Sequence, residues 1–210
     1  MKLTQASASL TVLRVLLGIS LLWLVVVAPL MLLTTVIGAT VGYGAGGAGL
    51  RVPVAFDAPA RTGLAQPPIG ANVLDPRASL GSAEIPLATT PLSVALPAGI
   101  LLVLATLAVV PAAMRAFGIT GRITHGGVDR RVVVLARQLP LLVAGGALLW
   151  SVFASAASVV TVSGLGDGSL RAVLSLAPLG WGLATALLTA VLSESLRVGL
   201  EYKEENDFTV

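Results

Sequence analysis

The sequence contains no cysteine and only one histidine. Without cysteine there is no disulfide bond, no thiolate ligand for a metal and no thiol nucleophile. His125 has no second histidine or cysteine nearby with which to bind a metal. Asp129 follows on the same segment, but no serine in a strained turn completes a catalytic set. We therefore predict a protein that is not an enzyme and that holds neither a metal nor another cofactor.

Charged residues are also scarce. They make up 11% of the chain, less than half of the roughly 25% that is usual in soluble domains. Hydrophobic residues make up 56% of the chain, and the mean hydropathy is +0.95. A soluble fold cannot bury this much apolar surface, so we predict an integral membrane protein.

The charge-free stretches locate the predicted spans. Each is long enough for one membrane-crossing helix of about 20 residues, and none comfortably holds two. The stretches are bounded by Arg14 and Arg51, by Glu84 and Arg115, by Arg137 and Asp167, and by Arg171 and Glu194. We expect an all-α membrane protein in which residues 1–210 form a single four-helix transmembrane domain. The predicted helices are 12–38, 92–117, 138–163 and 172–198.

The first apolar run raises two alternatives. Val15 to Ile37 is far longer than the roughly 7–15 apolar residues of a cleaved signal peptide, which favours a retained helix over cleavage. Thr40 to Gly44 spells TVGYG, the sequence of a potassium-channel selectivity filter. A filter needs a pore helix before it and an inner helix soon after, whereas here a full span precedes and a long loop follows. We interpret the stretch as the outer end of the first helix.

The distribution of Lys and Arg predicts the topology. One group lies near the predicted inner ends of the helices and in the tail, and a smaller group lies in the predicted outer segments. The first group is Lys2, Arg14, Arg115, Arg122, Arg130, Arg131, Arg137, Arg197 and Lys203, and the second is Arg51, Arg61, Arg77 and Arg171. We therefore expect both termini, the 118–137 connection and the tail 199–210 to be cytoplasmic, and the 39–91 loop to face outward.

The long outer loop is rich in proline and glycine. Two of its stretches, LRVPVAF and SAEIPLAT, have a strand-like pattern, although proline restricts them to edge or irregular positions. We expect either a short β-hairpin or an irregular loop in the 39–91 segment.

The predicted spans carry no ionisable residue at mid-membrane, where transporters and pumps place the groups that mark their paths. The alternative of a channel or transporter subunit depends on a sparse row of hydroxyls: Thr34, Thr35, Thr161, Thr185, Thr189 and Ser193. Small residues allow the helices to approach closely. They are Gly145, Gly146, Ser151, Ser155, Ser158, Gly180 and Gly182.

Five charged residues fall near the cytoplasmic boundary: Arg14, Arg115, Arg137, Glu194 and Arg197. One interpretation is that they anchor the helix ends by extending to the interface. The other is a charge-paired collar in which Glu194 faces Arg14 or Arg137. Nearby, residues 128–139 have the pattern of an interfacial helix that runs into the third span. Its arginines either contact anionic lipid head groups or only satisfy the topology.

The tail continues the fourth helix, because Glu194, Arg197 and Glu201 stand at i,i+3 and i,i+4 spacings. Gly199, Tyr202 and the final Glu205-Asn206-Asp207-Phe208-Thr209-Val210 resemble the end of a family of small bacterial four-helix membrane proteins, classified as a domain of unknown function. A polar turn over Gly121 to Arg137 adds to the likeness, although Ile123-Thr124-His125-Gly126 stand where that family has Phe and Asn.

The resemblance implies no enzymatic activity, a bacterial cell membrane location and a helix-turn-helix regulator encoded nearby. We therefore expect a non-enzymatic regulatory or interaction protein that presents its cytoplasmic face to a partner, with no direct nucleic-acid contact. Besides the lipid bilayer, the expected partner is a cytoplasmic regulatory protein. The candidate interaction residues are Arg130, Arg131, Glu201, Glu205, Asn206, Asp207, Phe208 and Val210.

Overall fold

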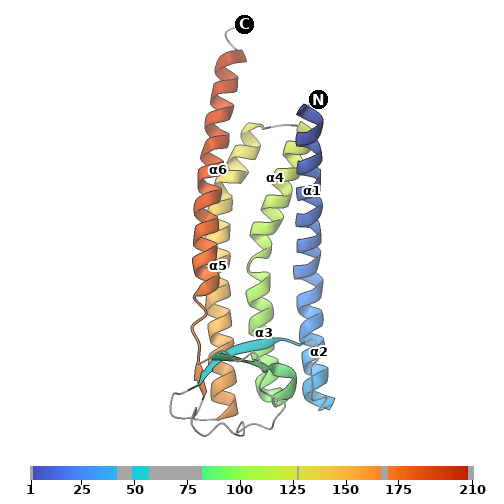
Figure 1. Ribbon diagram of the computed structural model, residues 1–210, viewed down its shortest axis with the longest axis vertical. Helices are drawn as coiled ribbons and strands as arrows, with labels where there is room; N and C mark the ends of the chain where they lie inside the picture. The colour runs from blue at the N-terminus through green and yellow to red at the C-terminus, as the bar shows by residue number, and fades with distance from the viewer. Residues whose placement is uncertain (1, 42–48, 57–81, 127, 167–169, 208–210) are drawn as a thin grey trace. The chain divides into compact units, whose positions relative to one another are not determined.

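The computed structural model describes residues 2–41, 49–56, 82–126, 128–166 and 170–207 (Figure 1). Four helical stretches among these residues are long and apolar enough to cross a membrane: Thr11–Thr40, Leu92–Thr124, Arg130–Leu165 and Ala177–Asn206. The prediction of four such helices is therefore confirmed. The helices are α1 (Lys2–Leu22), the π-helix η1 (Trp23–Val27), α2 (Ala28–Val41), α3 (Leu92–Leu107), α4 (Val110–Gly126), α5 (Arg130–Leu165) and α6 (Ala177–Asp207).

Prolines explain where two of the stretches depart from a regular α-helix. The π-helix η1 lies just before Pro29, which has no N–H to donate to the preceding turn. The break between α3 and α4 lies just before Pro111, for the same reason. Pro97 and Pro140 lie inside α3 and α5, which continue past them.

Two predicted boundaries differ from the structure. Helix α6 begins at Ala177 rather than at residue 172, because Leu170–Ala172 form a strand, β3. The connection predicted over 118–137 is mostly helical, since α4 continues to Gly126 and α5 begins at Arg130. The predicted interfacial helix is the first part of α5, which runs on to Leu165. In the TVGYG stretch, α2 ends at Val41, and residues 42–44 lie outside the described residues.

The chain divides into two compact units. One comprises Val26–Leu107 and Leu149–Leu176, and we call it the sheet unit. The other comprises Met1–Val25, Ala108–Leu148 and Ala177–Val210, and we call it the charged unit because the predicted charged site lies on it.

The sheet unit contains a three-stranded antiparallel sheet in the order β2-β1-β3 (Figure 1). Strands β1 (Arg51–Phe56) and β2 (Ser82–Pro86) confirm the predicted hairpin pairing, with Val52 opposite Ile85. The third strand, β3, was missed by the sequence analysis. Pro53 is tolerated in the middle strand because β3 pairs only from Val54 onward, so Pro53 has one neighbouring strand.

The alternation of β1 builds the core of the sheet unit. Val52 and Val54 point to one face of the sheet and are fully buried. Arg51 points outward, and its Nη1 lies 3.9 Å from Oε2 of Glu84. The buried face packs against small residues of α3 and α5 and against the short 3₁₀ helix η3 (Leu87–Thr89). The other buried members of this core are Ile85, Leu87, Ala95, Ala98, Ala157 and Leu170.

Serine hydroxyls on α5 attach the sheet and the segment after β3. Ser158 Oγ donates to the carbonyl of Pro53 at 2.8 Å and accepts from the amide of Val173 at 2.9 Å. Ser155 Oγ accepts from the amide of Ser175 at 3.0 Å, and Ser151 donates to the carbonyl of the same residue. We predicted these serines as small helix-packing residues. In the structure their hydroxyls bind β1 and the extended segment after β3.

Small residues do bring α5 and α6 together in the charged unit, as predicted for Gly182. A Cβ placed on Gly182 of α6 would overlap the Cβ of Ala147 on α5. One placed on Gly146 would lie 2.9 Å from the carbonyl oxygen of Ala108, between α3 and α4. Around Gly145 and Gly180 the same construction meets nothing within 4 Å, so these two glycines do not mediate close packing among the described residues.

The charged unit has its own apolar core between α4, α5 and α6. Its buried members are Ile119, Val132 and Ala136, and Leu196 of α6 packs against them. The first turn of α5 and the last turns of α4 and α6 are therefore held together at one place in this unit.

Candidate functional site

The predicted interaction residues lie on the first turn of α5 and the last turns of α6, which we call the α5–α6 charged surface. Asp129 caps the start of α5, because its Oδ1 accepts a hydrogen bond from the amide of Val132 at 2.7 Å. Val132 is buried, and the two preceding residues, Arg130 and Arg131, are exposed. The cap and the buried valine thus orient this basic pair toward the surface.

A two-point ion pair joins the two elements of this surface. Arg130 Nε lies 3.0 Å from Glu204 Oε1, and Arg130 Nη2 lies 2.8 Å from Glu204 Oε2. Paired contacts of this kind fix the orientation of a guanidinium group as well as its position. The arginine side chain remains 81% exposed, so solvent screening keeps the pair's contribution to stability small. Its main effect is to hold the tail of α6 beside the start of α5.

Glu204 was missing from the predicted residues. The two partners are 74 residues apart in sequence, and no local pattern connects them. Their approach depends on the antiparallel packing of α5 and α6.

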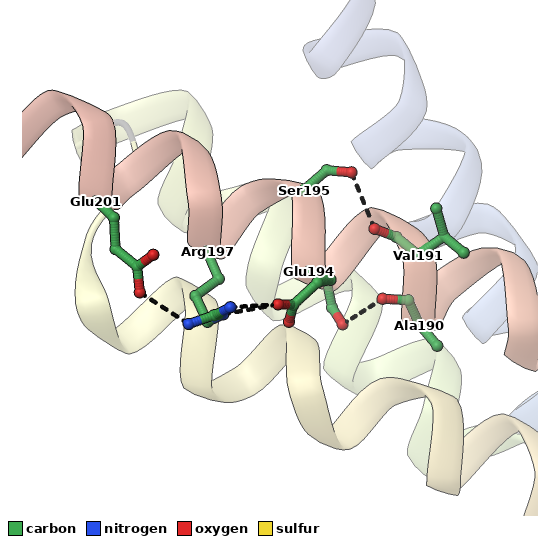
Figure 2. Close-up of polar contacts among 7 residues, drawn as sticks. Ala190, Val191, Glu194, Ser195, Arg197 and Glu201 are labelled. Atoms are coloured by element: carbon green, nitrogen blue, oxygen red, sulfur yellow. Dashed lines mark hydrogen bonds and ion pairs between the residues drawn. The ribbon is translucent and has the colours of Figure 1, made fainter.

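Within α6, Arg197 lies between two carboxylates (Figure 2). Its Nε donates to Glu194 Oε1 at 2.9 Å, and its Nη1 donates to Glu201 Oε1 at 2.8 Å. These contacts confirm the pairing predicted from the i,i+3 and i,i+4 spacings. Ser193 and Ser195 donate to carbonyls one turn earlier, at Ala190 and Val191, and so remain within the helix.

The collar predicted around Glu194 has a different arrangement. Glu194 is hydrogen-bonded to Arg197 of its own helix, because three residues of α-helix bring the two side chains together. Arg137 contributes only a longer-range attraction to Glu194. Arg14 instead lies over the ring of Phe117, with 5.2 Å between its Cζ and the ring centroid.

Gly121 makes room for Arg14 on α4. A Cβ placed on this glycine would lie 3.4 Å from Arg14 Cζ, so the guanidinium group rests close to the helix backbone. The contact with Phe117 is a cation–π interaction, worth about 0.5–1 kcal/mol at an exposed site. Arg14 therefore serves to pack α1 on α4.

The remaining predicted residues lie at the end of α6 or outside the described part of the chain. Glu205 and Asn206 lie on the last turn of α6 and are exposed, and Asp207 ends the helix. Phe208 and Val210 lie outside the described residues, as does the side chain of His125. In the part of the chain that the structure describes, no three His, Cys, Asp or Glu side chains gather where a metal would bind.

The hydroxyls proposed for a polar path bond back to their own helices. Thr34 and Thr35 both donate to Met31, and Thr161 donates to Ala157. In α6, Thr185, Thr189 and Ser193 likewise donate to carbonyls one turn earlier. Such back-bonds occupy the hydroxyl protons of these six side chains.

Sequence and structure together thus provide a charged surface with defined geometry as the candidate site. Comparison of the chain with protein-family models, with curated proteins and with solved structures gives no match.

Proposed function

We propose that this chain is a non-enzymatic, multi-pass membrane protein that binds a cytoplasmic regulatory protein through its α5–α6 charged surface. In this proposal both termini face the cytoplasm, so the surface projects from the inner side of the membrane.

The observation that carries the proposal is the ion pair between Arg130 and Glu204. The sequence predicted interaction residues at the start of α5 and in the tail of α6 as two separate segments. This ion pair joins the two segments into one surface. A helical tail held at one end loses less conformational entropy on binding than a free tail does.

The charges around this pair define what would bind. Arg131, Glu205 and Asn206 are exposed. A partner of matching chemistry would present a basic or amide side chain to the end of α6. The resemblance of the final residues to the family described above makes a helix-turn-helix regulator the partner that we propose.

The test is co-purification from native membranes with three forms of the chain. The full chain should retain the regulator, and deletion of residues 201–210 should abolish its retention. Glu204→Gln should weaken it, because the tail is then no longer held beside α5. Glu84→Gln removes a carboxylate from β2 of the sheet unit and serves as the matched control.

Retention of the same partners by the deleted chain would contradict the proposal. Ion or solute flux through liposomes that contain only the purified chain would instead favour the alternative of a channel or transporter subunit.

A further inference from the structure

The charged unit carries a second basic region that goes beyond the proposed function. It consists of Arg115 and Arg122 on α4 and Arg131 on the first turn of α5. Arg115 and Arg122 are separated by seven positions, so they lie on the same face of α4. Because Ile119 packs against Val132, the α4 face is held beside the start of α5. We call this set the arginine face.

Within the described part of the chain, the charge of the arginine face is not neutralised. No carboxylate pairs with these three guanidinium groups among the described residues. The nearest acidic segment is the end of α6, where Glu194 and Glu201 already contact Arg197 and where Glu204 contacts Arg130. Asp129 is bonded to the α5 backbone as its cap. The arginines of α4 thus keep their positive charge, whereas the positive charge of Arg197 on α6 is balanced by carboxylates of the same helix.

The surface between Arg115 and Arg122 is open. Gly118 stands between them on nearly the same face of α4, and it is exposed. A Cβ placed on Gly118 would meet nothing within 4 Å. A negatively charged group can therefore approach the helix backbone between the two guanidinium groups without displacing a side chain.

The depth of the arginine face indicates which anion fits. Arg115 and Arg122 lie in the last part of Leu92–Thr124, a stretch apolar enough to cross a membrane. When that stretch spans a bilayer, the two side chains reach the level of the lipid head groups. A soluble acidic protein would have to displace lipid to contact Arg115, whereas a lipid phosphate is already at that level.

We propose that the arginine face binds the phosphate of anionic phospholipids and that it thereby enriches these lipids beside α4 and α5. The occupant is a membrane lipid and not a free phosphate ion or an acidic peptide.

The experiment measures energy transfer from the tryptophans of the full chain to pyrene-labelled lipid. The chain is reconstituted into phosphatidylcholine vesicles that contain either pyrene-labelled phosphatidylglycerol or pyrene-labelled phosphatidylcholine. The ratio of the two transfer efficiencies reports the preference for the anionic lipid. The donors are Trp23, Trp150 and Trp181.

Arg122→Gln should lower this preference about fivefold at low salt, since each basic side chain near an anionic surface contributes about a factor of five. Arg115→Gln and Arg131→Gln should act in the same direction. Lys203→Gln removes one positive charge from the acidic end of α6 and should have much less effect. Arg122→Lys keeps the positive charge and should keep most of the preference for the anionic lipid. This variant shows whether the loss in Arg122→Gln comes from the missing charge or from a disturbed fold.

Three results would overturn the proposal. One is an unchanged preference in all three glutamine variants. Another is an equal loss in Lys203→Gln or in Arg122→Lys. The third is loss of the preference in the full chain on addition of inorganic phosphate but not of chloride at the same ionic strength, which would make the region a site for free phosphate.

Discussion

Ser158 provides the sharpest test of how the sheet unit is held together. Its side chain is fully buried on α5, and its hydroxyl serves two backbone groups, the carbonyl of Pro53 and the amide of Val173. Ser158→Ala would leave both groups without this partner. A buried polar group that loses its partner costs roughly 1–3 kcal/mol, and a carbonyl costs less than an amide. We therefore expect Ser158→Ala to lower the free energy of unfolding by about 2–4 kcal/mol.

The measurement is unfolding in mixed micelles with increasing sodium dodecyl sulfate, followed by near-ultraviolet circular dichroism. Ser163→Ala is the matched control, because Ser163 is exposed on the same helix and donates only to its own helix, at Val160. The control should change the free energy of unfolding by less than about 0.5 kcal/mol. If Ser158→Ala changes it as little as the control does, the two hydrogen bonds do not hold β1 and β3 to α5.

Three further predictions follow from local geometry. Gly182→Val should destabilise the chain by about 1–3 kcal/mol in the same unfolding assay, because the added Cβ would overlap that of Ala147; an unchanged stability would mean that α5 and α6 pack more loosely here. Asp129→Ala should cost about 1 kcal/mol through loss of the α5 cap, whereas Asp129→Asn should cost less, and equal losses in both would implicate the charge instead. Because the chain has no cysteine, single introduced cysteines report its topology. In intact cells Ala65→Cys should react with an impermeant maleimide and Lys203→Cys should not, and the reverse pattern would invert the proposed orientation.

The four helices of membrane-crossing length were predictable because they depend on local composition. Long uncharged stretches identify membrane-length helices without knowledge of their neighbours. The pairing of Arg197 with Glu194 and Glu201 was predictable for a similar reason, since helical spacing alone brings these side chains together. Strands β1 and β2 were also visible as alternating segments.

Strand β3 could not be found in this way. Its three residues are too few to show an alternating pattern, and they form a strand only because β1 lies beside them. The same limit applies to Ser158, whose partners are 105 and 15 residues away. As a sequence feature, a serine in an apolar helix indicates only a small side chain, and its hydrogen-bond partners depend on what packs against it.

Four helices of membrane-crossing length could be predicted without knowledge of the fold, because apolar length and missing charge are properties of each segment alone. The charged residues at the ends of those helices were visible in the sequence as well. Which of these charged residues meet depends on the tertiary structure. Arg130 is joined to Glu204 rather than left as a separate basic feature, and Arg14 lies on Phe117 rather than against Glu194. These outcomes depend on the packing of separate helices, where the register of one helix against the next selects the partner of each side chain.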